Sequence, residues 1–416
     1  MLPPNTETPV VILGAGIVGI CTALSLLERG VPVTLIDRNE PGQETSMGNA
    51  GVVSPWSVIP QSLPGTWKKI PKLLFGYGRP LSVDPRVALK MVPWGVRFLR
   101  LGQEKHVRKA AEAMSLLCGP SIELYQKHLR GSGHEGLITD SMYVHAFRDG
   151  SRANLNDLDY RIRTEMGADT ELVGRNRLSM IEPALSPEFN AAILIKDQAR
   201  VRSPGRLAKI LAAKAEALGA SFKKMVIRRV AKKDTGWAIQ CDGEVLHSEC
   251  IVMCLGVWSP GLLKGTDLSM PLMAERGYHV EFADPGIEIN NSVMDVDAKV
   301  VISSMEGGVR IAGQAEFAPV DAAPNEKRKD QLMWIARSAF PNLRIDSPTF
   351  WMGRRPSFPD SLPMLGETPG QPGLYFNFGH SHYGLMMAPK SGEYLAQYIC
   401  GEVVNANLEP FSSTRF

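Results

Sequence analysis

The clearest hydrophobic pattern lies near the start of the chain, in VVILGAGIVGICTALSLLERGVPVTLIDR. Residues 10–13 form a continuous apolar run, which is typical of a parallel strand buried on both faces. Apolar residues then recur at helical spacing to about Arg29, and Gly30 suits the end of a helix. A second apolar run, 33–36, ends at Asp37. The pattern predicts a strand, a helix and a second strand in one β-α-β unit.

Further helices and strands are predicted along the rest of the chain. Ser203, Pro204 and Gly219 mark the two ends of one helix. Helical spacing also predicts a helix over 107–129 and a closing helix over 390–400. Apolar patterns predict strands over 222–230, 236–240, 245–247, 250–255, 270–282 and 300–316. We expect the last two of these strands to pair in an antiparallel sheet.

Composition narrows the class of protein. A chain of 416 residues is long enough for two domains and a large core. Hydrophobic residues make up 44% and charged residues 21%, as in an ordinary globular protein, and the net charge of +3 argues against nucleic-acid binding. The sequence shows neither a signal peptide nor a run of about eighteen apolar residues that would span a membrane.

The cysteines indicate a reducing compartment, so we expect a cytoplasmic location. None stands in a CxxC pair, and in a chain this long they are expected to be free thiols. They are Cys21, Cys118, Cys241, Cys250, Cys254 and Cys400.

Residues 56–109 are unusually basic. The segment holds eleven Lys or Arg residues against only Asp84 and Glu104, and it contains Trp56, Trp67 and Trp94. One interpretation is a solvated helical excursion. The other is a surface that contacts a membrane or an acidic partner, which would place the protein peripherally at the inner membrane.

The turn after the first strand has the chemistry of a dinucleotide site. Gly14 can form the tight turn, Gly16 lets a pyrophosphate approach the backbone, and Gly19 lets the helix pack close to the strand. Asp37, eighteen residues beyond Gly19, can accept hydrogen bonds from an adenosine ribose. The motif does not distinguish FAD from NAD, because both contain the ADP moiety that it binds.

Together the motifs resemble the D-amino-acid oxidase superfamily of flavoproteins, and most of all the bacterial D-amino-acid dehydrogenases. The resemblance covers nearly the whole chain. Its motifs are GAGIVG, ETSMGNAGVVSP, SPGRL, VMCLGVWSP, ERGY, RIAGQAEF, RRPSFPDSLPMLG and GHSHYGLMMAP. It implies an α/β fold in which a discontinuous Rossmann-type FAD-binding domain (1–55, 195–268 and 348–416) carries an α+β substrate domain on an antiparallel sheet (56–194 and 269–347).

The resemblance implies FAD as the cofactor and a set of residues that hold it. The residues implied at the pyrophosphate and the ribose are Gly14, Ala15, Gly16, Ile17, Gly19, Asp37 and Arg38. Residues implied along the ribityl chain and the isoalloxazine ring are Thr45, Ser46, Asn49, Ala50 and Gly51. Val226, Gly256 and Trp258 are implied at the ADP side, and the backbone N–H groups of Gly384, Leu385 and Met386 at the flavin pyrimidine.

The family pattern also implies a substrate site with a cationic fork. Arg355 matches the residue that binds an amino-acid carboxylate, and Arg354 is its competitor because neighbours on a strand face opposite ways. A structural salt bridge between Arg355 and Asp360 is the alternative. Tyr278 is expected either to donate a hydroxyl to the substrate or to pack as an ordinary core tyrosine.

The stretch GHSHYG carries two histidines, and their role is open from the sequence alone. His380 is expected to be structural, whereas His382 and Tyr383 are expected to reach the substrate. Some relatives, such as glycine oxidase, have a second basic residue at the position of His382. We expect no metal site, because a third ligand of matching type is missing from the same loop.

The implied reaction is oxidative deamination. Hydride passes from the Cα of an amino acid, expected to be a D-amino acid, to flavin N5, and water hydrolyses the imino acid to a 2-oxo acid and ammonia. Electrons pass to a quinone or another acceptor. Two alternatives stay open: a secondary-amine oxidase or dehydrogenase for hydroxyproline, sarcosine or an opine, and a flavin-binding subunit that is inactive outside a hetero-oligomer.

Overall fold

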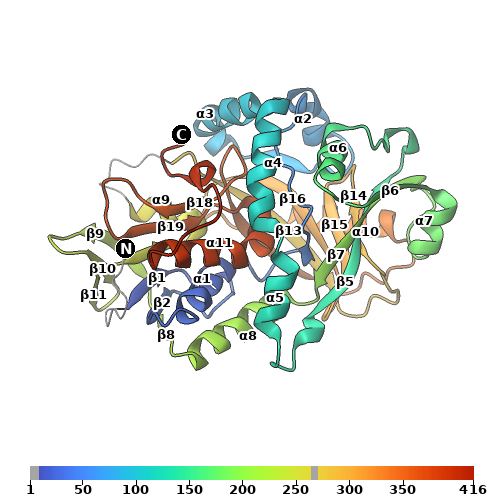
Figure 1. Cartoon of the computed structure of the whole chain (residues 1–416). Coiled ribbons are helices and arrows are strands. Elements are labelled where there is room, and N and C mark those ends of the chain that lie inside the picture. Colours follow the sequence, from blue (N-terminus) through green and yellow to red (C-terminus); the bar gives the residue numbers. More distant parts are fainter. Residues whose placement is uncertain (1–8, 264–269) are drawn as a thin grey trace.

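The computed structural model describes residues 9–263 and 270–416, which form two large sheets and one small sheet with helices around them (Figure 1). In Figure 1 the six-stranded sheet occupies the left half of the molecule and the larger sheet the right half. The helices are α1 (Ile17–Leu27), α2 (Thr66–Phe75), α3 (Pro85–Leu101), α4 (Glu104–Cys118), α5 (Ser121–Leu129), α6 (Leu158–Glu165), α7 (Arg175–Ile181), α8 (Pro204–Ala217), α9 (Ser259–Leu262), α10 (Lys327–Ala339) and α11 (Gly384–Ile399).

The six-stranded sheet is the predicted nucleotide-binding sheet. All its neighbouring pairs are parallel except β18 with β19. In order, its strands are β18 (Met364–Glu367), β19 (Leu374–Phe378), β12 (Ile251–Met253), β1 (Val10–Leu13), β2 (Val33–Asp37) and β8 (Ser221–Lys224). The β1 side chains are buried on both faces of the sheet, which explains their continuous apolar run.

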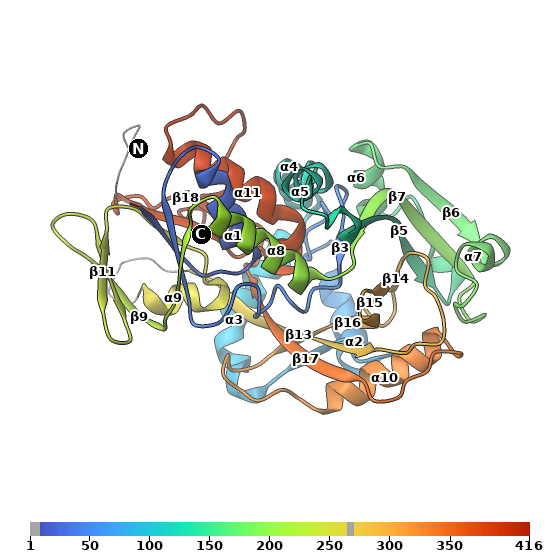
Figure 2. The same ribbon diagram turned by 90° about the horizontal axis from the view of Figure 1, so that it is seen from below.

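Each face of this sheet is covered by a separate layer. Val10, Ile12 and Leu35 pack in one cluster with apolar residues of α1, α4 and α11. Val11 and Leu13 pack on the other face with residues of a small three-stranded antiparallel sheet. Its strands are β9 (Ile227–Lys232), β10 (Trp237–Cys241) and β11 (Val245–Ser248). Figure 2 shows α1, α8 and α11 together on one side and β9 and β11 at the far left.

The larger sheet is mainly antiparallel and has ten strands. In order they are β17 (Thr349–Ser357), β13 (Met273–Phe282), β16 (Gly308–Phe317), β15 (Val300–Met305), β14 (Ser292–Asp295), β5 (Ile138–Phe147), β7 (Ala191–Val201) and β3 (Val52–Val53), with β4 (Leu81–Val83) beside β16 and β6 (Thr170–Gly174) beside β7. The predicted antiparallel pairing is confirmed, since β13 pairs with β16. The segment 300–316 is two strands rather than one, because the chain reverses at Gly308, whose φ is +126°.

Two predicted helices have different bounds in the structure. The segment 107–129 is two helices, α4 and α5, which are separated at Gly119 and Pro120. The closing helix begins at Gly384 instead of near 390, with Pro389 inside it. Both differences involve proline, which breaks the first helix and is accommodated in the second.

The division into two domains stays a prediction. Three segments near its boundaries lie in the larger sheet. Residues 52–53, 195–201 and 349–357 were assigned to the cofactor domain, but they pair within the larger sheet. These segments link the two sheets. Within the two described ranges, no helix has the length and apolar character needed to cross a membrane.

Candidate cofactor and substrate site

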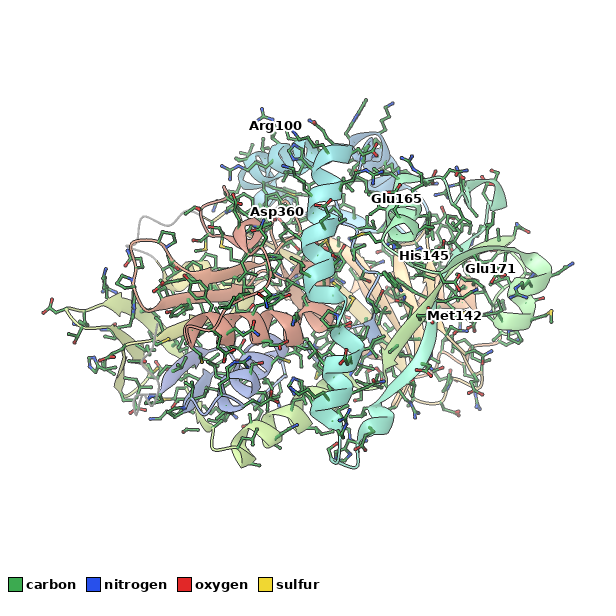
Figure 3. The ribbon with its side chains drawn as sticks, viewed as in Figure 1. Arg100, Met142, His145, Glu165, Glu171 and Asp360 are labelled. Atoms are coloured by element: carbon green, nitrogen blue, oxygen red, sulfur yellow. The ribbon has the colours of Figure 1, made fainter. Side chains whose placement is uncertain are left out.

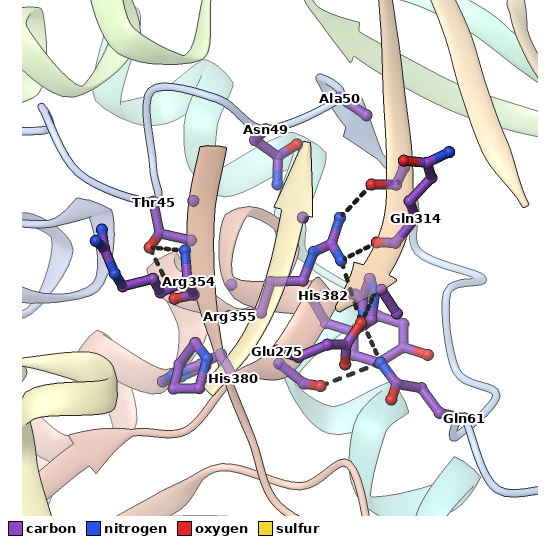
Figure 4. A pocket seen from close by; sticks show the side chains of 18 of the residues that line it. Thr45, Asn49, Ala50, Gln61, Glu275, Gln314, Arg354, Arg355, His380 and His382 are labelled. Carbon is purple, nitrogen blue, oxygen red and sulfur yellow. Dashed lines mark hydrogen bonds and ion pairs between the residues drawn. The ribbon is translucent and has the colours of Figure 1, made fainter. Parts of the chain in front are cut away.

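A cavity of about 1430 Å³ lies where the two sheets meet. Of the predicted cofactor and substrate residues, all line this cavity except Ala15, Gly19 and Gly51. The structure therefore brings together segments from β1, β2, β13, β17 and the start of α11, which are far apart in the sequence. Figure 4 shows the part of the cavity that lies over the larger sheet.

The glycine turn after β1 has the predicted geometry. Gly14 has a φ of +109°, and a Cβ atom there would lie 2.6 Å from the Cys254 carbonyl oxygen. A Cβ at Gly19 would lie 1.9 Å from the Gly14 carbonyl oxygen, so helix α1 approaches the turn as closely as glycine allows. The first turn of α1 carries no acidic residue. A helix N-terminus of this kind favours a bound phosphate.

Two side chains organise the backbone around the turn. The Asp37 carboxylate accepts a hydrogen bond from the Ala15 N–H at 2.8 Å, and the Ser46 hydroxyl accepts one from the Ile17 N–H at 3.0 Å. Ala15 therefore acts through its backbone, by holding Asp37 in place. Burial raises the pKa of Asp37, and hydrogen bonds from Asn39 and Ala15 oppose this rise.

The segment Thr45–Gly51 runs between the two sheets. The Thr45 hydroxyl donates to the Arg354 carbonyl at 2.9 Å, and the Asn49 side chain accepts from the Gly51 N–H at 2.8 Å. Gly51 has a φ of +81° and packs against Val201, outside the cavity. Its contribution is to let the chain turn, so that the preceding residues face the cavity.

The far end of the cavity holds the predicted ADP-side residues. Val226, Gly256 and Trp258 all line it. The Arg38 guanidinium lies 4.2 Å from the centre of the Trp258 ring and pairs with Glu44 at 2.5 Å. Arg38 and Glu44 therefore form a polar rim at this end of the cavity.

The stretch containing the two histidines leads directly into helix α11. Gly384, Leu385 and Met386 form its first turn, which carries no acidic residue, and all three line the cavity. The backbone N–H groups of a first helical turn have no partners within the helix, so they can donate to a ligand. The predicted backbone donors are thus part of a helix N-terminus, whose dipole also favours negative charge.

A distant tyrosine makes this early helix start possible. Pro389 has no N–H to donate to the Leu385 carbonyl, as position i−4 of a helix would require. The Tyr125 hydroxyl, from α5, donates to that carbonyl at 2.7 Å. The helix can therefore begin before its proline without leaving a buried carbonyl unpaired.

Arg355 lies on the cavity face of the larger sheet. Its Nη1 donates to Glu275 Oε1 at 3.1 Å and to the Gln314 carbonyl at 2.8 Å, and its Nη2 donates to the Gly313 carbonyl at 3.5 Å. A Cβ atom at Gly277 would lie 2.1 Å from Arg355 Nη2. The guanidinium thus lies across β13, in the space that the missing side chain of Gly277 leaves free.

Glu275 is the site residue that the sequence did not reveal as such. It is 3% exposed and contacts Arg355, His382 Nε2 at 3.0 Å and the Ser357 hydroxyl at 3.0 Å. Burial alone would raise its pKa, but attraction to His382 and Arg355 and the hydrogen bond from Ser357 outweigh burial and lower the pKa to about 2. The ERGY motif contained it, and it shares a strand face with Gly277.

Arg354 points away from Arg355, as expected for neighbours on a strand (Figure 4). Its Nε donates to the Val320 carbonyl at 2.6 Å, and its guanidinium lies 5.7 Å from the Trp258 ring centre. The alternative salt bridge between Arg355 and Asp360 is wrong, because Asp360 pairs with Arg415 at 2.7 Å. Arg355 pairs with Glu275 instead.

Tyr278 does not reach the cavity with its hydroxyl. It is 1% exposed, stacks on Phe350, and its hydroxyl donates to Glu316. Three positions separate it from Glu275 on β13, so the two side chains lie on opposite faces of the sheet. The packed-tyrosine alternative therefore describes its environment, and a direct contact with substrate is not supported.

His382 lies at the cavity with both ring nitrogens engaged. Its Nε2 contacts Glu275, and its Nδ1 contacts the Gln61 amide nitrogen. An amide nitrogen donates, so these partners favour the tautomer with hydrogen on Nε2. Burial lowers the pKa of His382, although Glu275 opposes the shift.

The neighbours of His382 have different roles. His380 is buried, its Nε2 contacts the Ser391 hydroxyl at 3.1 Å, and burial lowers its pKa to about 3. The Tyr383 hydroxyl donates to the Ile59 carbonyl at 2.7 Å, which ties the loop to the segment after β3. In the described parts of the chain, no three His, Cys, Asp or Glu side chains are arranged to hold a metal ion.

These residues fit an FAD molecule. Missing side chains at Gly14 and Gly16 leave room for a phosphate, the Asp37 carboxylate lines the same cavity, and so do the N-termini of two helices without acidic residues in their first turns. These groups match the parts of FAD, which are a diphosphate, a ribose and a pyrimidine ring that accumulates negative charge on reduction.

Comparisons with known proteins agree with this fit. Residues 9–398 match the family model DAO, described as FAD dependent oxidoreductase. The chain is 36% identical over 427 aligned positions to a D-amino-acid oxidase from Bradyrhizobium diazoefficiens, with 98% of each chain covered.

Solved structures share the fold at lower sequence identity. A glycine oxidase from Geobacillus kaustophilus is 20% identical, with 98% of this chain and 99% of that chain covered and a TM-score of 0.75. An L-proline dehydrogenase from P. horikoshii is 19% identical, with 100% and 98% covered and a TM-score of 0.72. Family model, relative and fold agree with the cavity geometry, and the chain belongs to the DAO family of FAD-dependent oxidoreductases.

Proposed function

We propose that the protein oxidatively deaminates a D-amino acid to a 2-oxo acid and ammonia. The observation that carries this proposal is the Arg355 guanidinium on the cavity floor, held flat over Gly277. A curated relative of 36% identity is named D-amino-acid oxidase, which supports the substrate class. FAD, when bound, supplies the hydride acceptor for the substrate Cα–H bond.

Arg355 has the donors needed to bind a carboxylate. Both hydrogens of Nη1 and one of Nη2 are directed at protein acceptors. Within the described part of the chain, this leaves Nε–H and the second Nη2–H, which lie side by side on the guanidinium. Two parallel N–H donors match a carboxylate bidentately. Arg355 thus fixes the substrate, while Glu275 and the two carbonyls fix Arg355.

The site provides placement and charge, and no strong base is needed. The substrate amine must be neutral to release hydride density, and water completes the hydrolysis. His382 has both ring nitrogens occupied, so we assign it to substrate selection and not to proton abstraction. The first turn of α11 offers backbone donors to the pyrimidine end of the cofactor, where negative charge develops.

We further propose that electrons pass to a quinone or similar carrier at a membrane surface. Helices α2 and α3 expose large apolar side chains: Trp67 (61% exposed), Phe75 (78%), Leu89 (87%), Val92, Val96 and Leu99. The last four recur at spacings of three and four residues, so they share one face of α3. Lysines and arginines flank them, and amphipathic helices of this type bind anionic lipid surfaces.

A vesicle experiment tests this surface. The protein should co-sediment with vesicles rich in phosphatidylserine and less with neutral phosphatidylcholine vesicles. Replacing Trp67 and Leu89 by Ser should reduce binding because apolar contact is lost, while Leu172→Ser, an exposed residue on β6, serves as the control. Equal binding of both variants would remove α2 and α3 as the contact.

The substrate itself is tested by anaerobic flavin reduction. Purified protein is expected to be yellow and to lose its flavin absorbance on addition of D-amino acids. Reduction by sarcosine, proline derivatives or opines instead would establish a secondary-amine enzyme, which the histidine at position 382 makes the second candidate. Bound FAD without reduction by any compound would favour the hetero-oligomer subunit, and activity restored by a partner would confirm it.

A further inference from the structure

The cavity continues past Arg355 into an arm that the proposed reaction does not use. The arm lies over strands β5, β14 and β15 and is bounded by α2, α6 and the turn at 296–299. Side chains on the sheet face at its floor are Tyr143, His145, Met294 and Val301. A small amino acid bound at Arg355 would leave this space empty.

The register of the sheet gives the direction of the arm. Ala312 pairs with Val301, Val301 with Met294, and Met294 with His145, so these residues lie in one row on one face. Ala312 also pairs with His279, which shares its strand face with Gly277. Neighbouring strands are about 4.8 Å apart, so the arm extends roughly 14 Å from β16 to β5.

The arm has an excess of positive charge. Five basic and three acidic side chains line it: Lys69, Lys72, Arg152, Arg163 and Lys299, against Asp157, Asp159 and Asp297. Arg152 and Lys72 pair with Asp297, and Arg163 pairs with Asp159. Across the residues that the structure describes, Lys69 and Lys299 have no carboxylate within ion-pair distance.

Lys299 occupies a constrained position in this arm. Its φ is +54°, a conformation that non-glycine residues seldom adopt and that clusters at functional sites. Its N–H donates to the Asp295 carbonyl at 2.9 Å, and its carbonyl accepts from the Gln314 N–H at 3.5 Å. Gln314 is the residue whose carbonyl holds Arg355. Lys299 is therefore hydrogen-bonded through its backbone to Gln314, the same residue whose carbonyl accepts from Arg355.

A buried histidine adds an unused polar atom. His145, which Figure 3 labels, is 5% exposed and lines the arm. Its Nδ1 contacts the Tyr160 hydroxyl at 2.8 Å, whereas its Nε2 is buried without a hydrogen-bond partner in the described part of the chain. Buried polar atoms are normally paired, so an unpaired nitrogen in the wall of the arm is unusual.

We propose that this arm binds a second anionic group, so that the preferred substrate is an amino acid whose side chain ends in a carboxylate. The proposal rests on the proposed function for the identity of the reacting group. Arg355 holds the carboxylate beside the reacting carbon, and Lys299 and Lys69 hold the distal one. Charge-assisted contacts to two lysines favour such substrates over equally long neutral ones.

Binding of non-reactive acids to the holoprotein tests the arm without turnover. The flavin absorbance is followed during titration with straight-chain monocarboxylates and dicarboxylates from three to eight carbons, and the dissociation constants are compared at equal chain length. We expect the best dicarboxylate to bind about tenfold or more tightly than its monocarboxylate partner, as a charge-assisted contact implies. Equal affinities throughout, or no perturbation by any acid, would overturn the proposal.

Variants assign the effect to the arm. Lys299→Asn, which keeps a residue that tolerates the left-handed backbone, and Lys69→Gln should each reduce the dicarboxylate preference. Lys68→Gln, the neighbouring α2 lysine outside the cavity lining, should leave it unchanged. A preference that survives both arm variants would contradict the assignment.

Two outcomes distinguish a failure of the proposed reaction from a failure of the proposed anion site. If no amino acid reduces the flavin but the dicarboxylate preference and its loss in Lys299→Asn persist, the proposed reaction fails and the anion site stands. If D-amino acids with neutral side chains are oxidised with a kcat/KM as high as that of acidic ones, the reaction stands and the arm proposal fails.

Discussion

At the scale of single residues, the substrate binding that we propose depends on Arg355 and on the carboxylate that holds it. A buried arginine beside a buried glutamate is stable only as a pair, and removal of one partner from such a pair costs about 3–5 kcal/mol. Glu275 therefore has two effects. It keeps Arg355 over Gly277, and it cancels part of the positive charge that a substrate carboxylate would meet.

The first prediction concerns the fork of Arg355. Arg355→Lys keeps a positive charge beside Glu275 but loses the paired donors, so we expect KM for the amino acid to rise by about tenfold or more while FAD stays bound. Steady-state kinetics and the flavin-to-protein absorbance ratio measure the two effects. Arg354→Lys, on the opposite sheet face, is the matched control and should change KM little. An unchanged KM in Arg355→Lys would remove Arg355 from the substrate site.

The second prediction concerns His382. His382→Ala removes a side chain that contacts Glu275 and Gln61 at the cavity, so relative kcat/KM values across a substrate panel should change more than the flavin content. His380→Ala is the comparison, because His380 is buried against Ser391 and does not contact Glu275. Complete loss of flavin in His382→Ala would make His382 part of the cofactor loop instead.

At the scale of elements, strand β13 creates room for Arg355 through one glycine. Gly277→Ala would place a Cβ atom 2.1 Å from Arg355 Nη2, so the guanidinium must move. We predict a raised KM with FAD retained. Gly174→Ala, before α7, has open space around the added atom and should leave KM as it is. Parallel behaviour of the two variants would show that Arg355 does not need this position.

The start of helix α11 depends on a hydrogen bond from another helix. Tyr125→Phe leaves the Leu385 carbonyl unpaired, which should cost about 1–3 kcal/mol of unfolding free energy. In a Pro389→Ala background the new N–H can pair with that carbonyl, so the same substitution should cost less. Urea unfolding of the two single variants and the double variant measures this coupling, and strict additivity would refute it.

These elements show how far the sequence could predict the fold. The β-α-β unit was predicted because its signals are local: a buried strand, three glycines and an acid in order. The start of α11 was missed because Gly384 and Pro389 weaken a helix in isolation, and the compensating bond comes from Tyr125. The break in 107–129 had a visible signal at Gly119 and Pro120, which the helical spacing outweighed.

The candidate site was predictable in part for a similar reason. Alternation along one strand separated Arg355 from Arg354 correctly. The partner of Arg355 could not be found in this way, because Glu275 reaches it only through the pairing of β13 with β17. Tyr278 was placed near the substrate by its motif, although its strand position puts it on the opposite face from Glu275.

At the scale of the whole molecule, buried neutral histidines make stability depend on pH. Burial lowers the pKa of both His279 and His380 to about 3, against an unfolded value near 6.5. Between these values the unfolded chain binds protons that the folded protein does not, so unfolding free energy falls as pH decreases from 6.5 towards 3. Each histidine contributes about 1.4 kcal/mol per pH unit in this range.

The effect of the histidines on unfolding free energy occurs at a higher pH than the effect of Glu275. The pKa of Glu275 is lowered to about 2, so its contribution is present above its usual value of 4.5 and is lost only below it. His380→Gln should therefore flatten the dependence of the urea midpoint on pH between 6.5 and 4.5. His106→Gln, an exposed residue on α4, should leave the slope unchanged. Identical slopes in wild type and His380→Gln would contradict the assignment.

We propose that the cavity between the two large sheets holds an amino-acid Cα beside bound FAD, with the carboxylate fixed by Arg355. Anaerobic rapid mixing of the holoprotein with a D-amino acid tests it most directly, with the same substrate deuterated at C2 as comparison. We predict loss of flavin absorbance, slower for the deuterated substrate, with one 2-oxo acid and one ammonia formed per flavin. Flavin that stays oxidised with every amino acid and secondary amine tested would contradict the claim.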